Sequence, residues 1–179
     1  LSFLLPGAGE YYAGSKKMAK IFFGTEVLLW SAYVSFRVYG NWKRKDYELF
    51  AVSHAGVQTT GRDHKYYIAM ENYNSLQEYN EAKLHQRNLA DLYPEDEAHF
   101  WQWDSSGSRE KFTALRVSSD QAFNRSLFVI GGIFINHVIS GIDALRLARK
   151  GEQARKKTIQ IGVAGLPEGG FVLSLWKVF

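Results

Sequence analysis

The sequence predicts a mainly α-helical integral membrane protein that ends in a β-hairpin, and three observations lead to this fold class. Two long apolar runs, 21–36 and 126–142, are separated by a polar, aromatic-rich segment. Basic residues gather beside both runs, as they do at the ends of membrane helices. The segment 158–179 then changes to alternating apolar and polar residues around a glycine-rich turn, which is typical of paired strands.

The composition excludes several classes of protein. The 179 residues include no cysteine, so disulfides, thiolate metal sites and a cysteine nucleophile are excluded. Hydrophobic residues make up 46% and charged residues 22%, which excludes a disordered chain. The net charge is +4, but no RNA- or DNA-binding signature accompanies the basic clusters, and nucleic acid is therefore not an expected partner.

The apolar segments predict a helical hairpin in a membrane. The segment 1–13 is too short for a ~30 Å hydrocarbon core, which needs about 20 residues, and predicts a re-entrant or interfacial helix. The two runs predict spans over 20–39 and 125–145, with Lys20 and Arg37 reaching the interfaces of the first. Both runs are of borderline length. A pair of buried helices in a soluble bundle is the alternative, and the mean hydropathy of −0.26 permits it.

The remaining segments complete a three-part organisation. The segment 40–122 predicts a helical extramembrane insertion, in which Ser75 and Glu78 form a capping box for a helix over 76–92. Residues 1–145 then make up a membrane domain, 146–157 a basic linker and 158–179 a β-hairpin tail. Because two strands alone are marginally stable in water, the tail is expected to pair with something else, such as another chain.

The most informative ionisable residues are Glu26 and His137, which lie inside the two apolar runs. Consecutive spans run antiparallel, so both residues are expected at matching depth, where they form an intramembrane polar pair, or Glu26 pairs with Asn136. Hydrogen bonding between the helices is one interpretation, and a proton or ion relay is another. A third is that the two residues face different partners.

Small and polar residues recur at helical spacing on one face of the second run. They let two backbones approach closely and predict a helix-packing face towards the first helix or a partner. Such a face lines a pore only when several copies assemble. Its members are Gly132, Asn136, Ser140 and Asp143.

No catalytic residue, metal or cofactor is expected. The acidic patch 95–97 lacks an EF-hand or H-E-x-x-H spacing and is interpreted as a solvated turn. The serines lie in no G-x-S-x-G context, and no P-loop or dinucleotide fingerprint is present. Exposed aromatics are instead expected to contact lipid headgroups or partner subunits, and the docking candidates are Trp101, Trp103, Phe171, Trp176 and Phe179.

The segment 6–14, P-G-A-G-E-Y-Y-A-G, resembles the P-G-x-G-[QE]-x-Y-x-G signature of an uncharacterised bacterial envelope family with a two-helix membrane domain. Blocks such as 54–56, 101–104 and 136–144 extend the resemblance over most of 1–145. It implies a place in the bacterial cell envelope, in the inner or the outer membrane, and no catalytic residue. At Glu10 this chain has glutamic acid, whereas glutamine is commoner at that position of the signature. The matching positions are Pro6, Gly7, Gly9, Glu10, Tyr12 and Gly14.

These observations predict a non-catalytic accessory or structural subunit of a larger membrane or envelope complex. Its expected partners are the lipid bilayer and other membrane protein subunits. One alternative is a transport or channel component that uses Glu26 and His137. Another is a soluble helical bundle that binds a ligand. The topology stays open, because basic residues flank both sides of the two runs in similar numbers.

Overall fold

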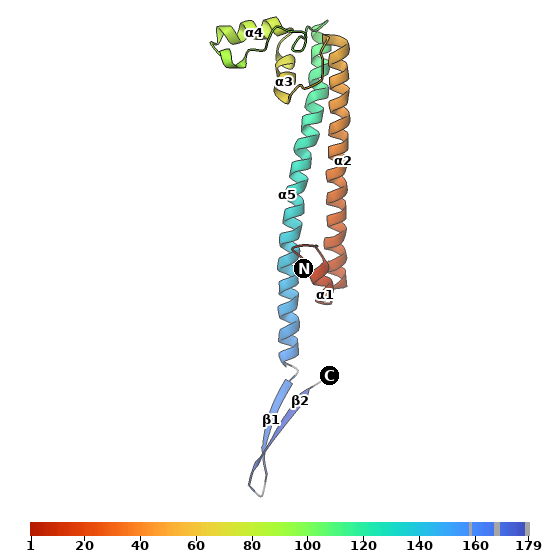
Figure 1. The fold of residues 1–179 in the computed structure, drawn as a ribbon. Helices are drawn as coiled ribbons and strands as arrows, with labels where there is room; N and C mark the ends of the chain where they lie inside the picture. The colour runs from red at the N-terminus through yellow and green to blue at the C-terminus, as the bar shows by residue number, and fades with distance from the viewer. Residues whose placement is uncertain (158, 167–168, 178–179) are drawn as a thin grey trace. The chain divides into compact units, whose positions relative to one another are not determined.

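The computed structural model describes residues 1–157, 159–166 and 169–177, and it is mainly helical with a small antiparallel sheet (Figure 1). The chain divides into two compact units: the first is Leu1–Ser31 with Val129–Phe179, and the second is Ala32–Phe128. The elements are α1 (Ala8–Tyr12), α2 (Lys16–Ala55), α3 (His64–Asn72), α4 (Leu76–His85), the 3-10 helix η1 (Leu89–Asp91), α5 (Ser106–Lys157), β1 (Ile159–Gly165) and β2 (Phe171–Lys177).

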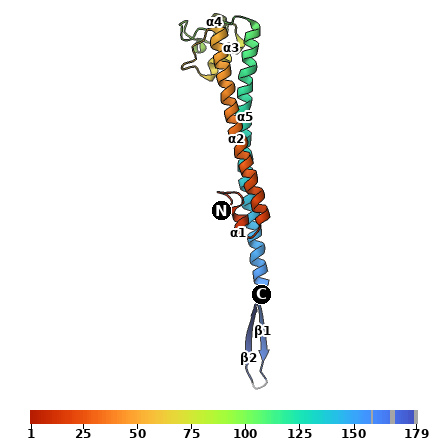
Figure 2. The same ribbon diagram turned by 90° about the vertical axis from the view of Figure 1, so that its right-hand side faces the viewer.

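In the first unit, α1 lies against the beginning of α2 and against α5 (Figure 2). The helix expected over 1–13 is much shorter, because α1 begins only at Ala8 and turns precede it. The reason is local: Gly7 has a φ of 92°, which a right-handed helix does not accommodate, and Pro6 precedes it. The N-terminal segment is therefore a folded turn followed by a single short helix.

Helix α5 continues through the segment that was expected to be a basic linker, and the linker interpretation of 146–157 is corrected accordingly. Leucine, alanine, arginine, lysine, glutamate and glutamine predominate there, and all favour helix. Gly151 is the exception, but one glycine costs a helix only about 1 kcal/mol. The β-hairpin is present as predicted, with β1 and β2 antiparallel and Val163 opposite Leu173.

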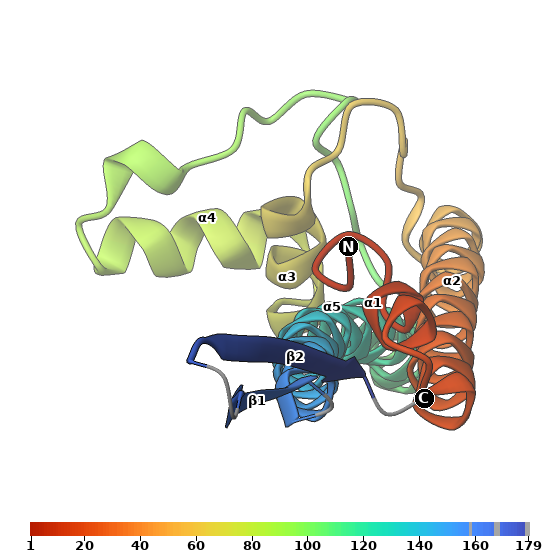
Figure 3. The same ribbon diagram turned by 90° about the horizontal axis from the view of Figure 1, so that it is seen from below.

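In the second unit, α3 and α4 begin at side-chain caps. Asp63 accepts a hydrogen bond from the backbone N–H of Tyr66, and Ser75 accepts one from that of Glu78, as the predicted cap requires. Seen from below, α4 extends away from α3 (Figure 3).

Helix α4 ends at His85, well before the predicted end at residue 92. Arg87 has a φ of 57°, and the N–H of Asn88 donates to the carbonyl of Lys83 at 2.9 Å. This is the geometry of a Schellman cap, formed without the glycine that normally marks it in a sequence.

The core of the second unit is aromatic, and it includes two tryptophans that were expected on a docking surface. Trp101 is completely buried, and Trp103 is nearly so, with its indole N–H donating to the carbonyl of Met70 at 2.8 Å. The backbone between them bonds to the end of α2, since Gln102 N–H donates to Ala55 at 3.0 Å. Trp101 and Trp103 are therefore corrected from docking residues to core residues, because their hydrogen-bonding indoles find buried partners. The other core side chains include Tyr47, Tyr66, Tyr67, Met70, Tyr79 and Phe112.

Candidate functional site

The first unit brings Glu26 of α2 together with Asn136 and His137 of α5. Glu26 is buried, and its Oε2 accepts a hydrogen bond from Asn136 Nδ2 at 2.9 Å. Its Oε1 lies 3.1 Å from His137 Nε2 and accepts from the indole N–H of Trp30 at 2.8 Å. Three side chains from two helices thus contact one carboxyl group, and both of its oxygens have hydrogen-bond partners from the chain itself.

The imidazole of His137 connects this carboxyl group to the N-terminal turn. Its Nδ1 lies 2.9 Å from the carbonyl oxygen of Phe3. Because a carbonyl oxygen only accepts, Nδ1 carries a hydrogen, and the contact between Nε2 and Glu26 holds one further proton. That proton resides either on the imidazole or on the carboxyl group. The pair is therefore chemically able to hold helices together or to exchange one proton.

A second polar contact joins α1 to α5, and it is built around Glu10. The Glu10 side chain is fully buried, and its two oxygens accept from Ser2 Oγ at 2.6 Å and from Ser140 Oγ at 2.7 Å. The same two hydroxyl oxygens also accept backbone hydrogen bonds, from Gly9 N–H at 2.8 Å and from Gly7 N–H at 2.9 Å. A buried carboxylate is costly without such partners, and here both of its oxygens are satisfied.

Close packing around α1 accounts for Gly7 and Gly9, the first two glycines of the sequence motif. A Cβ atom at Gly7 would lie 2.5 Å from the carbonyl oxygen of Ala19. One at Gly9 would lie 2.4 Å from Ser2 Oγ and 2.7 Å from Ala144 Cβ. Any side chain at these two positions would therefore push α1 away from its neighbours.

The other motif residues have different places. Pro6 is buried, whereas Tyr12 is 87% exposed. Gly14 has a φ of 87° in the turn before α2, with open space around it. Its conformation, rather than a close contact, is the reason for a glycine there.

The predicted packing face on α5 lies largely against α2 and the N-terminal turn. A Cβ at Gly132 would meet Leu29 at 3.3 Å, and Asn136 and Ser140 make the contacts described above. Asp143 is half-buried, and its Oδ2 is enclosed without a hydrogen-bond partner among the described residues. The remaining docking candidates lie in the tail: Phe171 is 84% exposed, the backbone of Trp176 pairs with Gln160, and Phe179 lies outside the described residues.

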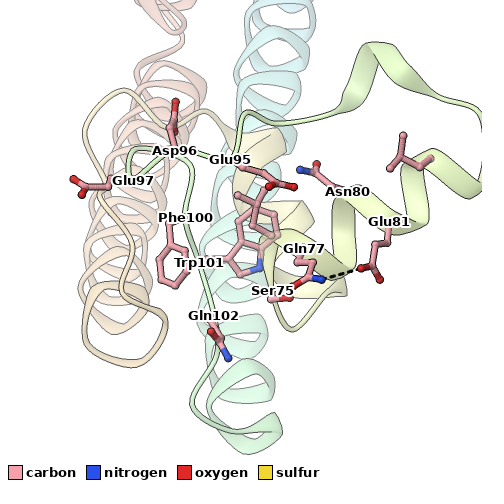
Figure 4. A pocket seen from close by; sticks show the side chains of 12 residues that line it. Ser75, Gln77, Asn80, Glu81, Glu95, Asp96, Glu97, Phe100, Trp101 and Gln102 are labelled. Atoms are coloured by element: carbon pink, nitrogen blue, oxygen red, sulfur yellow. Dashed lines mark hydrogen bonds between the residues drawn. The ribbon is translucent and has the colours of Figure 1, made fainter.

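The second unit has a groove of about 680 Å³ between α4 and the segment 95–102 (Figure 4). Glu95 points towards α4, whereas Glu97 points away from it. The hydrogen bond from His99 holds the pKa of Asp96 below its usual range, so this carboxylate is ionised at neutral pH. Among the described residues, the charged side chains that line the groove are all acidic: Glu81, Glu95, Asp96 and Glu97. Within the described part of the chain, no group of three or more histidine or acidic side chains is placed to hold a metal ion.

Sequence reasoning missed the contributions of Ser2, Trp30 and the Phe3 carbonyl. Ser2 lies outside any periodic segment, and a backbone carbonyl has no sequence signal at all. Trp30 was a detectable omission, because it follows Glu26 by four residues on one helix and so lies on the same face.

The fold and these contacts define a mainly helical protein in which two helices, α2 and α5, are long and apolar enough to cross a membrane. Comparison of the sequence with protein-family models gives no match, and comparisons with curated proteins and with solved structures give none either.

Proposed function

We propose that the protein is an accessory or structural subunit of a larger complex in a bacterial envelope membrane. In this proposal α2 and α5 cross the bilayer as an antiparallel pair through 20–39 and 125–145, and the segment 40–122 forms an extramembrane head. The resemblance of the segment 6–14 to a bacterial envelope signature supports the choice of membrane. The proposed partners are the lipid bilayer and other membrane protein subunits.

The exposed apolar surface of α2 and α5 is the observation that carries the proposal. Only 11% of the most apolar stretch of α2 and 22% of that of α5 are buried. Side chains such as Leu28, Phe128 and Phe134 are largely exposed. A soluble bundle buries such side chains in its core, and a continuous apolar surface of this kind indicates contact with lipid or protein. The buried polar residues Glu26 and Asn136 of these helices bond to each other, as polar residues of membrane helices do.

The saturated contacts around Glu26 and Glu10 support a structural role over an enzymatic one. Each carboxyl group is surrounded by donors from the chain itself, so a substrate would have to displace them. The partly exposed ring of His137, which shares one proton with Glu26, favours the transport alternative instead. Transport is therefore the second candidate function.

Two features support protein partners. The carboxylates of the groove in the head favour a partner segment that carries lysine or arginine. The β-hairpin leaves apolar side chains such as Phe171 and Leu173 largely exposed, and a two-stranded sheet gains stability when a further strand or surface covers it.

Fractionation of native membranes tests the proposal. Membranes are washed with alkaline carbonate and solubilised in mild detergent, and the chain is then detected on a native gel. It should stay in the membrane and migrate far above its own mass of 20.4 kDa, together with its partners. Release by carbonate would overturn the membrane assignment. Migration as a monomer would overturn the subunit assignment while leaving the membrane assignment in place.

A further inference from the structure

We propose that the groove between α1 and the beginning of α2 binds one anionic phospholipid. The phosphate would lie at Lys16 and Lys20, and an acyl chain would lie along the apolar wall. The inference rests on the proposed membrane location and adds a bound lipid to that proposal.

The groove has an apolar lining that suits an acyl chain. Its volume is about 360 Å³, and its walls include the exposed apolar side chains of Leu5 and Phe23 and the ring of Tyr11. Buried Pro6 and Ala19 lie at its base. Among the residues that the structure describes, the two lysines are the only charged side chains that line it. Such a surface is favourably covered by hydrocarbon rather than by water.

The charged end of the groove is suited to an anion. Lys16 and Lys20 are four residues apart and therefore lie on the same face of α2, both exposed. Neither has an ion pair within 4 Å among the described residues, and the neighbouring Glu10 is buried and bonded to Ser2 and Ser140. Glu26, which is equally near in the sequence, is also buried and bonded to Asn136, so both of these carboxyl groups are engaged with partners other than the lysines.

The helix itself adds to the positive charge. The first turn of α2 contains no acidic residue, although acidic side chains are the favourable ones at a helix N-terminus. Two lysines four residues apart also repel each other. A phosphodiester beside Lys16 and Lys20 would supply the missing negative charge at the helix N-terminus and would also reduce the repulsion between the two lysines.

The order of residues along α2 distinguishes a phospholipid from a free anion. Lys16 and Lys20 precede the apolar run, and Phe23, which belongs to that run, follows Lys20 within one helical turn. Charged and apolar walls therefore succeed each other along the direction in which α2 would enter the bilayer. Headgroup and acyl chain follow one another in the same order, whereas inorganic phosphate would use only the charged end.

The test uses the full chain, purified from carbonate-washed membranes and placed in nanodiscs of equal parts phosphatidylglycerol and phosphatidylcholine. Native mass spectrometry then identifies the lipids that stay bound. One retained phosphatidylglycerol per chain is expected. The Lys16→Gln/Lys20→Gln variant should weaken its retention roughly 10- to 30-fold, as expected for the loss of two basic contacts to an anionic lipid.

The control variant is Lys17→Gln/Lys45→Gln, which removes the same charge from α2 at exposed positions outside the groove. It should retain the lipid, and Phe23→Ala should weaken retention without changing the preference for phosphatidylglycerol. The inference would be overturned if both double variants lost the lipid equally, or if phosphatidylcholine were retained as well as phosphatidylglycerol. It would also be overturned if inorganic phosphate displaced the lipid, or if a second copy of the chain occupied the groove. A chain that carbonate releases would instead refute the membrane proposal, which keeps the two failures distinct.

Discussion

Ser140 of α5 donates a 2.7 Å hydrogen bond to the carboxylate of Glu10 in α1, although 130 residues separate them in the chain. The Ser140 hydroxyl also accepts from the N–H of Gly7, so one side chain joins the N-terminal turn, α1 and α5. All of these groups are buried. Because no water replaces a lost partner there, the contact is expected to contribute measurably to stability.

The first prediction concerns this contact. Ser140→Ala leaves the Gly7 N–H and one Glu10 oxygen buried without a partner, and should lower the free energy of unfolding by about 1–3 kcal/mol. Glu10→Gln keeps the shape and one acceptor and should cost less, whereas Glu10→Ala also leaves a cavity and should cost more. Thermal unfolding in detergent measures all three. The control is the exposed Tyr12→Ala, and an equal effect of this variant would refute the prediction.

The second prediction separates the two interpretations of Glu26. If Glu26 only holds α2 and α5 together, Glu26→Gln keeps an acceptor for one of Asn136 and Trp30, which bond to different oxygens, and costs about 1 kcal/mol, since interhelical hydrogen bonds in membranes average ~0.6 kcal/mol. If Glu26 and His137 exchange a proton, the variant stays folded but loses proton movement. Unfolding midpoints and proton flux into dye-loaded liposomes are measured together. Flux that is absent from the unmodified protein as well as from the variant would refute the relay.

The sequence predicted the parts of this fold that rest on regular spacing. The meeting of Glu26 with Asn136 and His137 follows from two antiparallel apolar runs, and the hairpin follows from alternation around a glycine-rich turn. It did not predict that Trp101 and Trp103 are buried, because their burial depends on the carbonyls of residues distant in the chain. The early end of α4 was missed for a related reason, since Arg87 adopts a conformation that usually indicates glycine.

A third prediction follows from the burial of Trp101. Trp101→Ala should destabilise the head by about 3–5 kcal/mol, as truncation of a fully buried aromatic side chain usually does. The neighbouring Phe100 is 45% exposed, and Phe100→Ala should cost far less. Limited proteolysis of the intact chain under increasing urea measures both. A Trp101→Ala variant of normal stability would return this tryptophan to the docking surface that the sequence suggested.

The fourth prediction is a pH dependence. Burial raises the pKa of Tyr93 from 10.0 to about 12 and raises that of Tyr66 further. The folded head therefore binds these phenolic protons more tightly than the unfolded chain does. The resulting stability is complete below pH 10 and should be lost as the pH rises through 12.

Phenolate absorbance measured against pH checks this directly. A late phase near pH 12 should be present, and Tyr93→Phe should remove part of it while leaving the earlier phase unchanged. If all phenols in the folded protein ionised in one phase near pH 10, the burial of these rings would be contradicted.

The last prediction concerns the acidic groove of the head as a contact with a partner. Glu95 and Glu97 line the groove and have no ion pair within 4 Å among the residues that the structure describes. Reversal of their charge by Glu95→Lys/Glu97→Lys should therefore leave the fold intact and weaken assembly with a cationic partner. On the native gel, this variant should move from the large complex towards the monomer, and the loss should be greater at low salt than at high salt, because screening weakens the repulsion. The control Asp46→Lys/Glu110→Lys makes the same charge change outside the groove and breaks only an exposed ion pair between Asp46 and Lys43, which contributes little to stability, so it should assemble normally. Equal disruption by both variants would mean that net charge, and not this groove, governs assembly.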